Sequence, residues 1–273
     1  MSSSSGPHQP IALITGASSG IGLAAAEHFA RRGWRTILVA RREQELSRLA
    51  SELSSSAPSF PIVLDVTDDD RLDAAVRDVL DRFGAPDALI NNAGSNDYMP
   101  FLDLSLATHR DIFRVNYHAP ARLIYLLLPA MLQRRKGHVI NITSMSAKIG
   151  PWGHSSYAAA KAALTSLTQT LAAEHEGSGV YFSYLHPGIV RTPYFESPAN
   201  RPLWDKQKRR AIEPDAVARA IVGLIDRPRL EVCVPAHFRL IDFLTALSPT
   251  IAHRIVARSS RVDLPPSSTP PLP

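Results

Sequence analysis

Short apolar or β-branched runs recur roughly every 25 residues along the chain, separated by stretches with the apolar spacing of helices. The runs predict strands over residues 11–15, 36–40, 62–65, 88–91, 138–142, 180–185 and 231–235. The spacing predicts helices over residues 21–32, 70–83, 106–134, 156–175 and 214–226. Such alternation favours an α/β fold with a parallel sheet covered on both faces. Ligands of this doubly wound type of sheet bind beyond the carboxyl ends of its strands.

Both ends of the chain differ from its middle. Residues 1–9 and the Pro-rich residues 261–273 lack a useful density of core-forming side chains, so we expect both to be disordered. Residues 10–235 then form one α/β domain, and residues 236–260 form a hydrophobic helical extension. Packing of this extension on the domain or across a subunit interface is favoured. The alternative is shallow membrane attachment, with head groups facing His237, Arg239, His253, Arg254 and Arg258.

The composition limits the class of protein. The chain has 273 residues, 45% of them hydrophobic, which suits one sizeable core. The single cysteine, Cys233, excludes an internal disulfide and lies in an apolar run that predicts a buried strand position. The polar start and the lack of a long apolar stretch favour a reduced, cytoplasmic protein. The net charge of +5 fits anionic ligands without requiring nucleic acid.

A glycine-rich turn follows the first predicted strand. Residues 11–22 read Ile-Ala-Leu-Ile-Thr-Gly-Ala-Ser-Ser-Gly-Ile-Gly, and a predicted helix comes next. The glycines allow the backbone to turn sharply and approach a pyrophosphate at the helix N-terminus. An ordinary turn is the alternative, but the position after the first strand of a βα pattern favours dinucleotide binding. The expected cofactor contacts in this turn are Gly16, Ser18, Ser19, Gly20, Ile21 and Gly22.

Two arginines stand at the end of the second predicted strand. Arg41 and Arg42 occupy the place where an NAD enzyme would carry an acidic residue for the ribose 2′-hydroxyl. An arginine cannot accept from that hydroxyl, but its fork of donors suits a 2′-phosphate. The alternative is that both arginines are solvated residues before a helix that begins at Glu43. The sequence therefore favours NADP(H).

The next two strand ends add weaker signals. A carboxylate after the third strand could accept from the adenine amino group, and asparagines after the fourth could tie loops together and line the pocket. Asp and Asn also occur at strand ends for turn reasons alone. The expected cofactor contacts here are Asp65, Val66, Asn92, Ala93 and Gly94.

A phenol and an ammonium share one face of a predicted helix. Tyr157 and Lys161 are four residues apart, and a nearby cation favours the phenolate, which lowers the tyrosine pKa towards a value useful for proton transfer. Ser144 follows the fifth strand, so its hydroxyl comes to the same edge of the sheet as the glycine turn. There it could hydrogen-bond a substrate oxygen. A serine that merely opens a loop is the alternative.

Together these segments resemble the short-chain dehydrogenase/reductase family over about residues 10–226. The resemblance rests on Thr-Gly-Ala-Ser-Ser-Gly-Ile-Gly (15–22), Asn-Asn-Ala-Gly (91–94), Asn116 in Arg-Val-Asn-Tyr, Ser144, Tyr-x-x-x-Lys (157–161) and His-Pro-Gly-Ile-Val-Arg-Thr (186–192). It implies a single Rossmann domain with a seven-stranded parallel sheet of order 3-2-1-4-5-6-7. It also implies an oxidoreductase without a catalytic metal.

The resemblance further implies residue roles. Tyr157 would be the general acid or base, and Ser144 would orient and polarise the carbonyl. Lys161 would lower the Tyr157 pKa and bind the nicotinamide ribose, and Asn116 would help to hold a water chain from Lys161 to solvent. The implied cofactor contacts after the sixth strand are Pro187, Gly188, Ile189 and Thr192.

The substrate is the least defined part. The resemblance places a covering segment at residues 193–213, and rim side chains predict an apolar pocket with Met99, Ser146, Trp152 and Tyr194 as substrate contacts. The main hypothesis is an NADP(H)-dependent carbonyl reductase or secondary alcohol dehydrogenase with a hydrophobic substrate. Several of the rim side chains could instead be ordinary core. The basic segment 201–210 is either a solvated lid helix or a guide for an anionic substrate or carrier, and a 3-oxoacyl-thioester reductase is the alternative enzyme. A catalytically weak NADP(H)-binding sensor or scaffold is the rival of another class. The resemblance also implies a homodimer or homotetramer.

Overall fold

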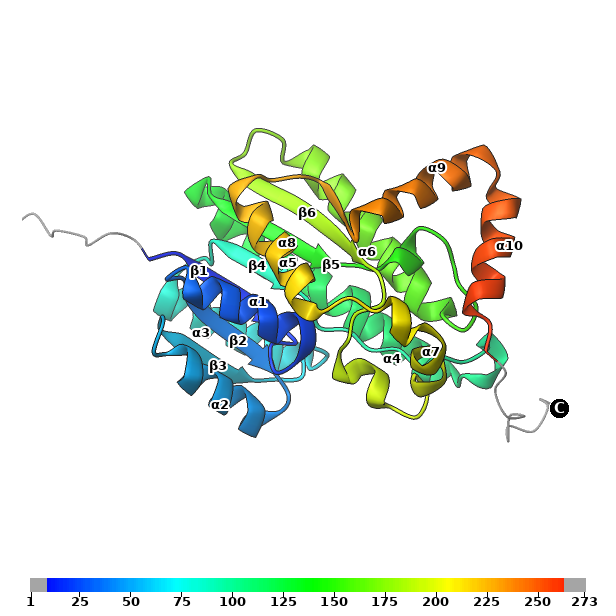
Figure 1. Cartoon of the computed structure of the whole chain (residues 1–273). Helices are drawn as coiled ribbons and strands as arrows, with labels where there is room; N and C mark the ends of the chain where they lie inside the picture. Colours follow the sequence, from blue (N-terminus) through cyan, green and yellow to red (C-terminus); the bar gives the residue numbers. More distant parts are fainter. Residues whose placement is uncertain (1–8, 263–273) are drawn as a thin grey trace, which may run out of the picture.

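A seven-stranded parallel sheet forms the centre of the protein in the computed structural model, which describes residues 9–262. The order is β3-β2-β1-β4-β5-β6-β7, so the expected fold class and strand order are confirmed (Figure 1). The strands are β1 (Ile11–Thr15), β2 (Arg35–Ala40), β3 (Ser59–Val63), β4 (Ala88–Asn91), β5 (Gly137–Ile142), β6 (Val180–Pro187) and β7 (Glu231–Val234).

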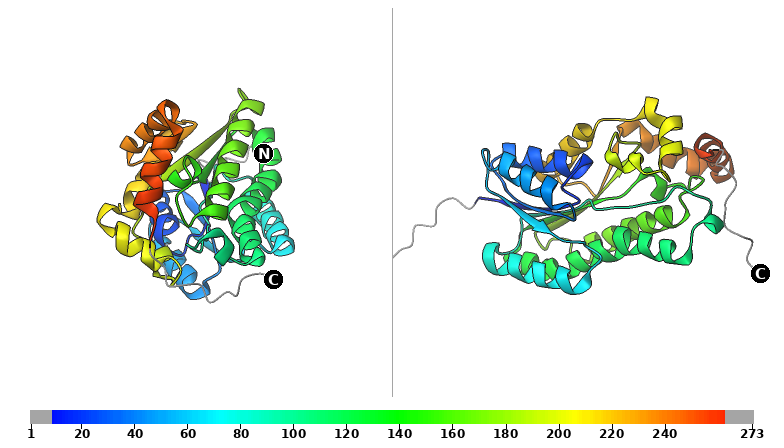
Figure 2. Two further views of the ribbon diagram at one scale, coloured as in Figure 1. Left: turned by 90° about the vertical axis from the view of Figure 1, so that its right-hand side faces the viewer. Right: turned by 90° about the horizontal axis from the view of Figure 1, so that it is seen from below.

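Helices cover both faces of the sheet (Figure 2). One face packs against α1 (Gly20–Arg31), α2 (Glu43–Leu53) and α8 (Pro214–Asp226). The other packs against α3 (Asp69–Phe83), α5 (Ala119–Arg134) and α6 (Ser155–Glu174).

Two apolar cores result, because successive strand side chains point to opposite faces. In β1, Ala12 and Ile14 pack into the first core and Ile11 and Leu13 into the second. Each fully buried Leu or Ile contributes about 1.5–3 kcal/mol relative to exposure.

Two elements differ from the sequence prediction. Strand β3 begins at Ser59, earlier than expected, and includes Pro61. A proline is tolerated there because β3 is an edge strand, whose outer side needs no N–H donor. The helix predicted over 106–134 is divided into α4 (Leu106–Phe113), a π-helical turn (Arg114–His118) and α5. Such turns often occur at functional sites, and this one carries Asn116.

The remaining helices are α7 (Arg201–Gln207), α9 (Leu240–Leu247) and α10 (Pro249–Ser260). Helices α9 and α10 project from the body near the carboxyl end of β6 (Figure 1). Within residues 9–262 no helix is long and apolar enough to cross a membrane. The termini predicted to be disordered lie, but for a few residues, outside the described part of the chain.

Candidate active site

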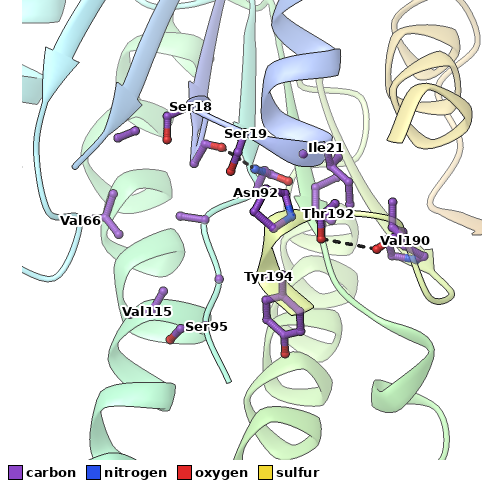
Figure 3. Close-up of a pocket in the computed structure, with 18 of the residues that line it drawn as sticks. Ser18, Ser19, Ile21, Val66, Asn92, Ser95, Val115, Val190, Thr192 and Tyr194 are labelled. Carbon is purple, nitrogen blue, oxygen red and sulfur yellow. Dashed lines mark hydrogen bonds between the residues drawn. The ribbon is translucent and has the colours of Figure 1, made fainter. Parts of the chain in front are cut away.

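A cavity of about 450 Å³ opens at the carboxyl ends of the strands (Figure 3). Most of the residues expected from the sequence line it. These are Gly16, Ser18, Ser19, Gly20, Ile21, Arg41, Arg42, Asp65, Val66, Asn92, Ala93, Gly94, Ser144, Tyr157, Lys161, Pro187, Gly188, Thr192 and Tyr194. Figure 3 shows Ser18 and Ser19 at one end and Tyr194 at the other.

The glycine turn is shaped for close backbone approach. Gly16 and Gly20 have φ angles of 66° and 56°, in the left-handed region that side chains disfavour. A Cβ at Gly22 would collide with the Gly16 carbonyl and lie 2.6 Å from the Asn92 amide nitrogen. Gly22 thus lies beneath the turn rather than on the cavity wall. The Ser19 side chain does not cap α1, and the first turn of α1 holds no acidic residue. The backbone N–H groups at the N-terminus of α1 can therefore bind an anion.

Asn92 and Thr15 hold the turn against the end of β4. The Thr15 hydroxyl accepts from the Asn92 and Ala93 backbone N–H groups, both at 3.0 Å. The Asn92 side chain donates to the Thr15 carbonyl at 2.9 Å. These bonds fix the first and fourth strand ends relative to each other, which is the tying role expected for this asparagine.

The end of β2 is strongly basic. The Arg42 guanidinium donates to the Ser18 hydroxyl at 3.0 Å. Arg41 is three-quarters exposed and lies 3.5 Å from Asp65. Burial acts to raise the pKa of Asp65, but hydrogen bonds from Thr67 and the Arg41 charge lower it below its usual range. Asp65 therefore stays ionised and available as an acceptor at the cavity wall.

Ser144, Tyr157 and Lys161 line the same cavity. Ser144 directly follows Thr143 at the end of β5, and its Oγ accepts from the Ser146 backbone N–H at 3.1 Å. Tyr157 and Lys161 lie in the first turns of α6. The Lys161 ammonium is almost fully buried, donates to the Ile142 carbonyl at 2.8 Å and lies 5.8 Å from the centre of the Tyr157 ring.

Burial dominates the proton affinities of this pair. It raises the pKa of Tyr157 to about 12, and the nearby Ser144 hydroxyl offsets part of the rise. It lowers the pKa of Lys161 to about 7. The direction for Tyr157 is opposite to the one expected from a neighbouring ammonium, because burial opposes the charged form of both groups. Lys161 is therefore poised to gain or lose a proton near neutral pH.

Asn116 lies behind Gly94 and does not reach the cavity wall. Its side-chain nitrogen donates to the carbonyls of Ser95 and Ile112 at 2.7 and 2.8 Å. Its Oδ1 has no hydrogen-bond partner among the described residues, and a Cβ on Gly94 would lie 2.9 Å from it and 3.6 Å from the Lys161 Nζ. Gly94 thus leaves no side chain of its own between the amide oxygen and the ammonium.

The segment after β6 differs in one position from expectation. Val190, not Ile189, lines the cavity, while Ile189 packs in a cluster with Tyr98, Phe195 and Leu203. Neighbouring side chains of an extended segment face opposite ways, so only one of the two can face the cavity. A Cβ on Gly20 would lie 2.7 Å from the Thr192 methyl group. The segment after β6 therefore packs against the glycine turn.

On the substrate side, Tyr194 is the one predicted contact that lines the cavity. Its ring centre lies 6.5 Å from that of Tyr157. Met99, Ser146 and Trp152 are not among the lining residues. Trp152 instead packs edge-on against Tyr98 at 5.3 Å, and its backbone N–H donates to Ser260. The cavity wall on this side is completed by Pro193 and Phe195.

Two histidines beside the site were missed from the sequence. His154 precedes α6, and its ring centre lies 5.5 Å from that of Tyr157. His186, in β6, is buried and lies 2.6 Å from the hydroxyl of Thr143. His186 is the first residue of the motif at 186–192, but no role was predicted for it, and His154 stands two residues before the predicted helix 156–175.

The positive charge of segment 201–210 is partly compensated by contacts within the protein. Lys208 pairs with Asp205 at 3.1 Å, and Arg201 lies 3.7 Å from the same carboxylate. Lys206 donates to the Arg258 and Arg261 carbonyls at the end of α10. This use of Lys206 in holding α10 leaves fewer free charges for an anionic substrate than the sequence count indicates.

The sheet order, the glycine turn and the Ser144–Tyr157–Lys161 cluster define a dinucleotide-binding α/β enzyme. The model of the short chain dehydrogenase family matches residues 10–201. The chain belongs to the short-chain dehydrogenase/reductase family and is an oxidoreductase.

Relatives agree over most of the chain. An uncharacterised oxidoreductase of Staphylococcus epidermidis is 31% identical over 220 residues, covering 81% of this chain and 92% of that protein. The crystal structure of a short-chain dehydrogenase from Streptomyces avermitilis matches with a TM-score of 0.78 and 31% identity, covering 94% of this chain and all of that one. A short-chain dehydrogenase from Sphingobium yanoikuyae in complex with NADPH matches with a TM-score of 0.75 and 30% identity, and the match covers 89% of this chain and 95% of that one.

Proposed function

We propose that the protein is an NADP(H)-dependent reductase of hydrophobic carbonyl compounds, or the corresponding secondary alcohol dehydrogenase. The observation that carries this proposal is that one cavity is lined both by Arg41, Arg42 and Ser18 and by Ser144, Tyr157 and Lys161. The NADPH complex of the Sphingobium relative supports the choice of cofactor.

The residues present fit a 2′-phosphorylated dinucleotide. The open N-terminus of α1 and the left-handed glycines suit the pyrophosphate. Arg42 beside Ser18 and the exposed Arg41 offer charge-assisted donors for the 2′-phosphate. Asp65 is an acceptor for the adenine amino group, and Thr192 and Val190 would lie along the nicotinamide.

The chain's own groups carry out the proton transfer. A bound nicotinamide supplies or accepts the hydride at the substrate carbon. The Tyr157 hydroxyl, protonated because of its high pKa, donates to the substrate oxygen during reduction, and Ser144 orients that oxygen. Lys161 stabilises the resulting phenolate and returns a proton to it. Asn116 and Gly94 line the passage by which Lys161 exchanges protons with solvent.

A fluorescence titration with NADPH and NADH tests this proposal directly. We expect the wild type to bind NADPH more tightly, and Arg41→Asp to weaken NADPH binding about 10- to 100-fold, because a charge-assisted contact is lost. The control Arg48→Asp makes the same charge change on α2 outside the cavity and should leave both affinities unchanged. Tyr157→Phe should keep its NADPH affinity and lose turnover of a panel of apolar ketones and aldehydes.

Each failure has a distinct meaning. A preference for NADH, or indifference to Arg41→Asp, would contradict the assignment of the β2 end. Equal turnover by wild type and Tyr157→Phe would refute the proton-transfer role. Normal NADPH binding without turnover of any carbonyl substrate would favour a sensor or scaffold instead.

A further inference from the structure

Helix α9 presents an apolar stripe to solvent. Leu240, Phe243, Leu244 and Leu247 are 63%, 65%, 51% and 69% exposed. Their spacing of i, i+3, i+4 and i+7 places them on one helical face. No residue of α9 is buried, and only Ile241 and Thr245 are half-buried. The expected packing of this segment on the domain therefore does not account for its apolar residues.

The stripe continues on α10 together with arginines. Ile251 and Ile255 are both 58% exposed, and Arg254 and Arg258 share their face by the same helical spacing. Arg239 precedes Leu240 and lies four residues before Phe243, on the α9 face. An apolar stripe on helices bordered by arginines is typical of segments that lie in a membrane interface.

Among the described residues, the charges of this segment that lack an ion-pair partner are of one sign. Residues 236–262 contain four arginines and a single carboxylate, Asp242, which pairs with Lys148 at 2.5 Å. None of the four arginine side chains forms an ion pair within the described chain. A symmetric contact between two copies of this face would bring the arginines together without carboxylates. An anionic lipid surface complements both the charge and the apolar stripe.

Both ends of the α9–α10 unit are fastened to the body of the protein. The Phe238 ring, just before α9, packs against Gly188, which lines the cavity. At the other end, Ser260 accepts from the Tyr98 hydroxyl and from the Trp152 backbone N–H. Figure 2 shows α9 and α10 side by side at this end of the molecule. The face is therefore a fixed surface rather than a free tail.

We propose that α9 and α10 bind the surface of an anionic phospholipid bilayer, with the apolar stripe among the head groups. This proposal is independent of the proposed reaction, and its test does not use turnover. The full chain is floated with vesicles of phosphatidylcholine alone or of phosphatidylcholine mixed with phosphatidylglycerol. We expect flotation with the anionic vesicles at low salt, weaker flotation at high salt, and little with phosphatidylcholine alone.

Matched variants separate the two parts of the surface. Phe243→Ser/Leu247→Ser should abolish flotation, whereas Leu102→Ser/Leu106→Ser, at least as exposed elsewhere on the surface, should not. Arg254→Glu/Arg258→Glu should weaken binding by about 25-fold or more, since each arginine near an anionic surface contributes about fivefold. Arg48→Glu/Arg82→Glu on α2 and α3 is the charge control.

Three outcomes would overturn the proposal. The wild type does not float with anionic vesicles, or Phe243→Ser/Leu247→Ser floats as well as the wild type. The third is that the wild type does not float and is an oligomer by light scattering, whereas Phe243→Ser/Leu247→Ser is a monomer. That result would identify the face as an interface between copies of the chain.

Discussion

Lys161 holds an ionisable ammonium in an almost fully buried position, and this has a measurable effect on stability. Its pKa is about 7 in the folded protein and near 10.5 in the unfolded chain. Between these values the unfolded chain binds more protons, so the free energy of unfolding rises with pH. The cost of burying the charge is fully present below pH 7 and disappears towards pH 10.5.

Lys161→Met is therefore expected to inactivate the enzyme and stabilise the fold. At pH 7 the gain has an upper limit of about 4 kcal/mol, reduced by about 1 kcal/mol for the lost hydrogen bond to Ile142. The gain should shrink as the pH rises to 9.5. Urea unfolding at both pH values measures it, with the exposed Lys208→Met as control. A gain independent of pH would show that Lys161 is not buried as a titrating group.

The sequence predicted the residues of the site wherever local geometry determines them. The glycine turn and Tyr157–Lys161 depend on spacing within one turn or helix, and the structure places them on the cavity. The orientations of the Ile189 and Trp152 side chains depend on the path of a loop and on which of two neighbouring side chains packs into the apolar cluster. The sequence places His186 in the motif at 186–192 but does not reveal its contact with Thr143, because that contact joins residues distant in sequence.

At the scale of elements, the sequence predicted the strands and most helices because strand periodicity and helix periodicity differ. It missed the π-helical turn at 114–118, since one extra residue in a turn leaves the apolar pattern almost unchanged. It also missed how α9 is fixed. Lys148, at the start of the loop before α6, binds both Glu231 of β7 and Asp242 of α9. Burial acts to lower the Lys148 pKa, but these carboxylates raise it above its ordinary value.

Lys148→Met should loosen α9 from the sheet. The half-buried Glu231 carboxylate would lose its cation, and a loss of about 1–3 kcal/mol of stability is expected. Hydrogen exchange should accelerate in α9 and remain unchanged in α1. Asp242→Asn is the comparison variant: only the α9 contact weakens while Glu231 keeps Lys148, so it should lose less stability than Lys148→Met. Unchanged exchange in α9 of Lys148→Met would mean that Phe238 and Ser260 alone hold the helix.

For the whole molecule, three buried histidines set the response to acid. His138, His154 and His186 are each less than 8% exposed, and burial lowers their pKa values to about 4. Unfolded histidine titrates near pH 6.5. Between pH 6.5 and 4 the unfolded chain therefore binds up to three more protons than the folded one. The stability contributed by the neutral rings is present above pH 6.5 and is lost as the pH falls through this window.

The slope of the free energy of unfolding against pH should report the contribution of each buried histidine. Three protons correspond to a maximum of about 4 kcal/mol per pH unit near pH 5. His138→Gln removes one titrating group while keeping a donor for the Ser183 hydroxyl, which lies 2.7 Å from the histidine nitrogen. The slope between pH 5 and 6 should then fall by about a third, whereas the exposed His253→Gln should leave it unchanged. Urea unfolding at closely spaced pH values measures both. An unaltered slope in His138→Gln would show that the pKa of His138 is the same in the folded and the unfolded chain, so that the response to acid would rest on His154 and His186.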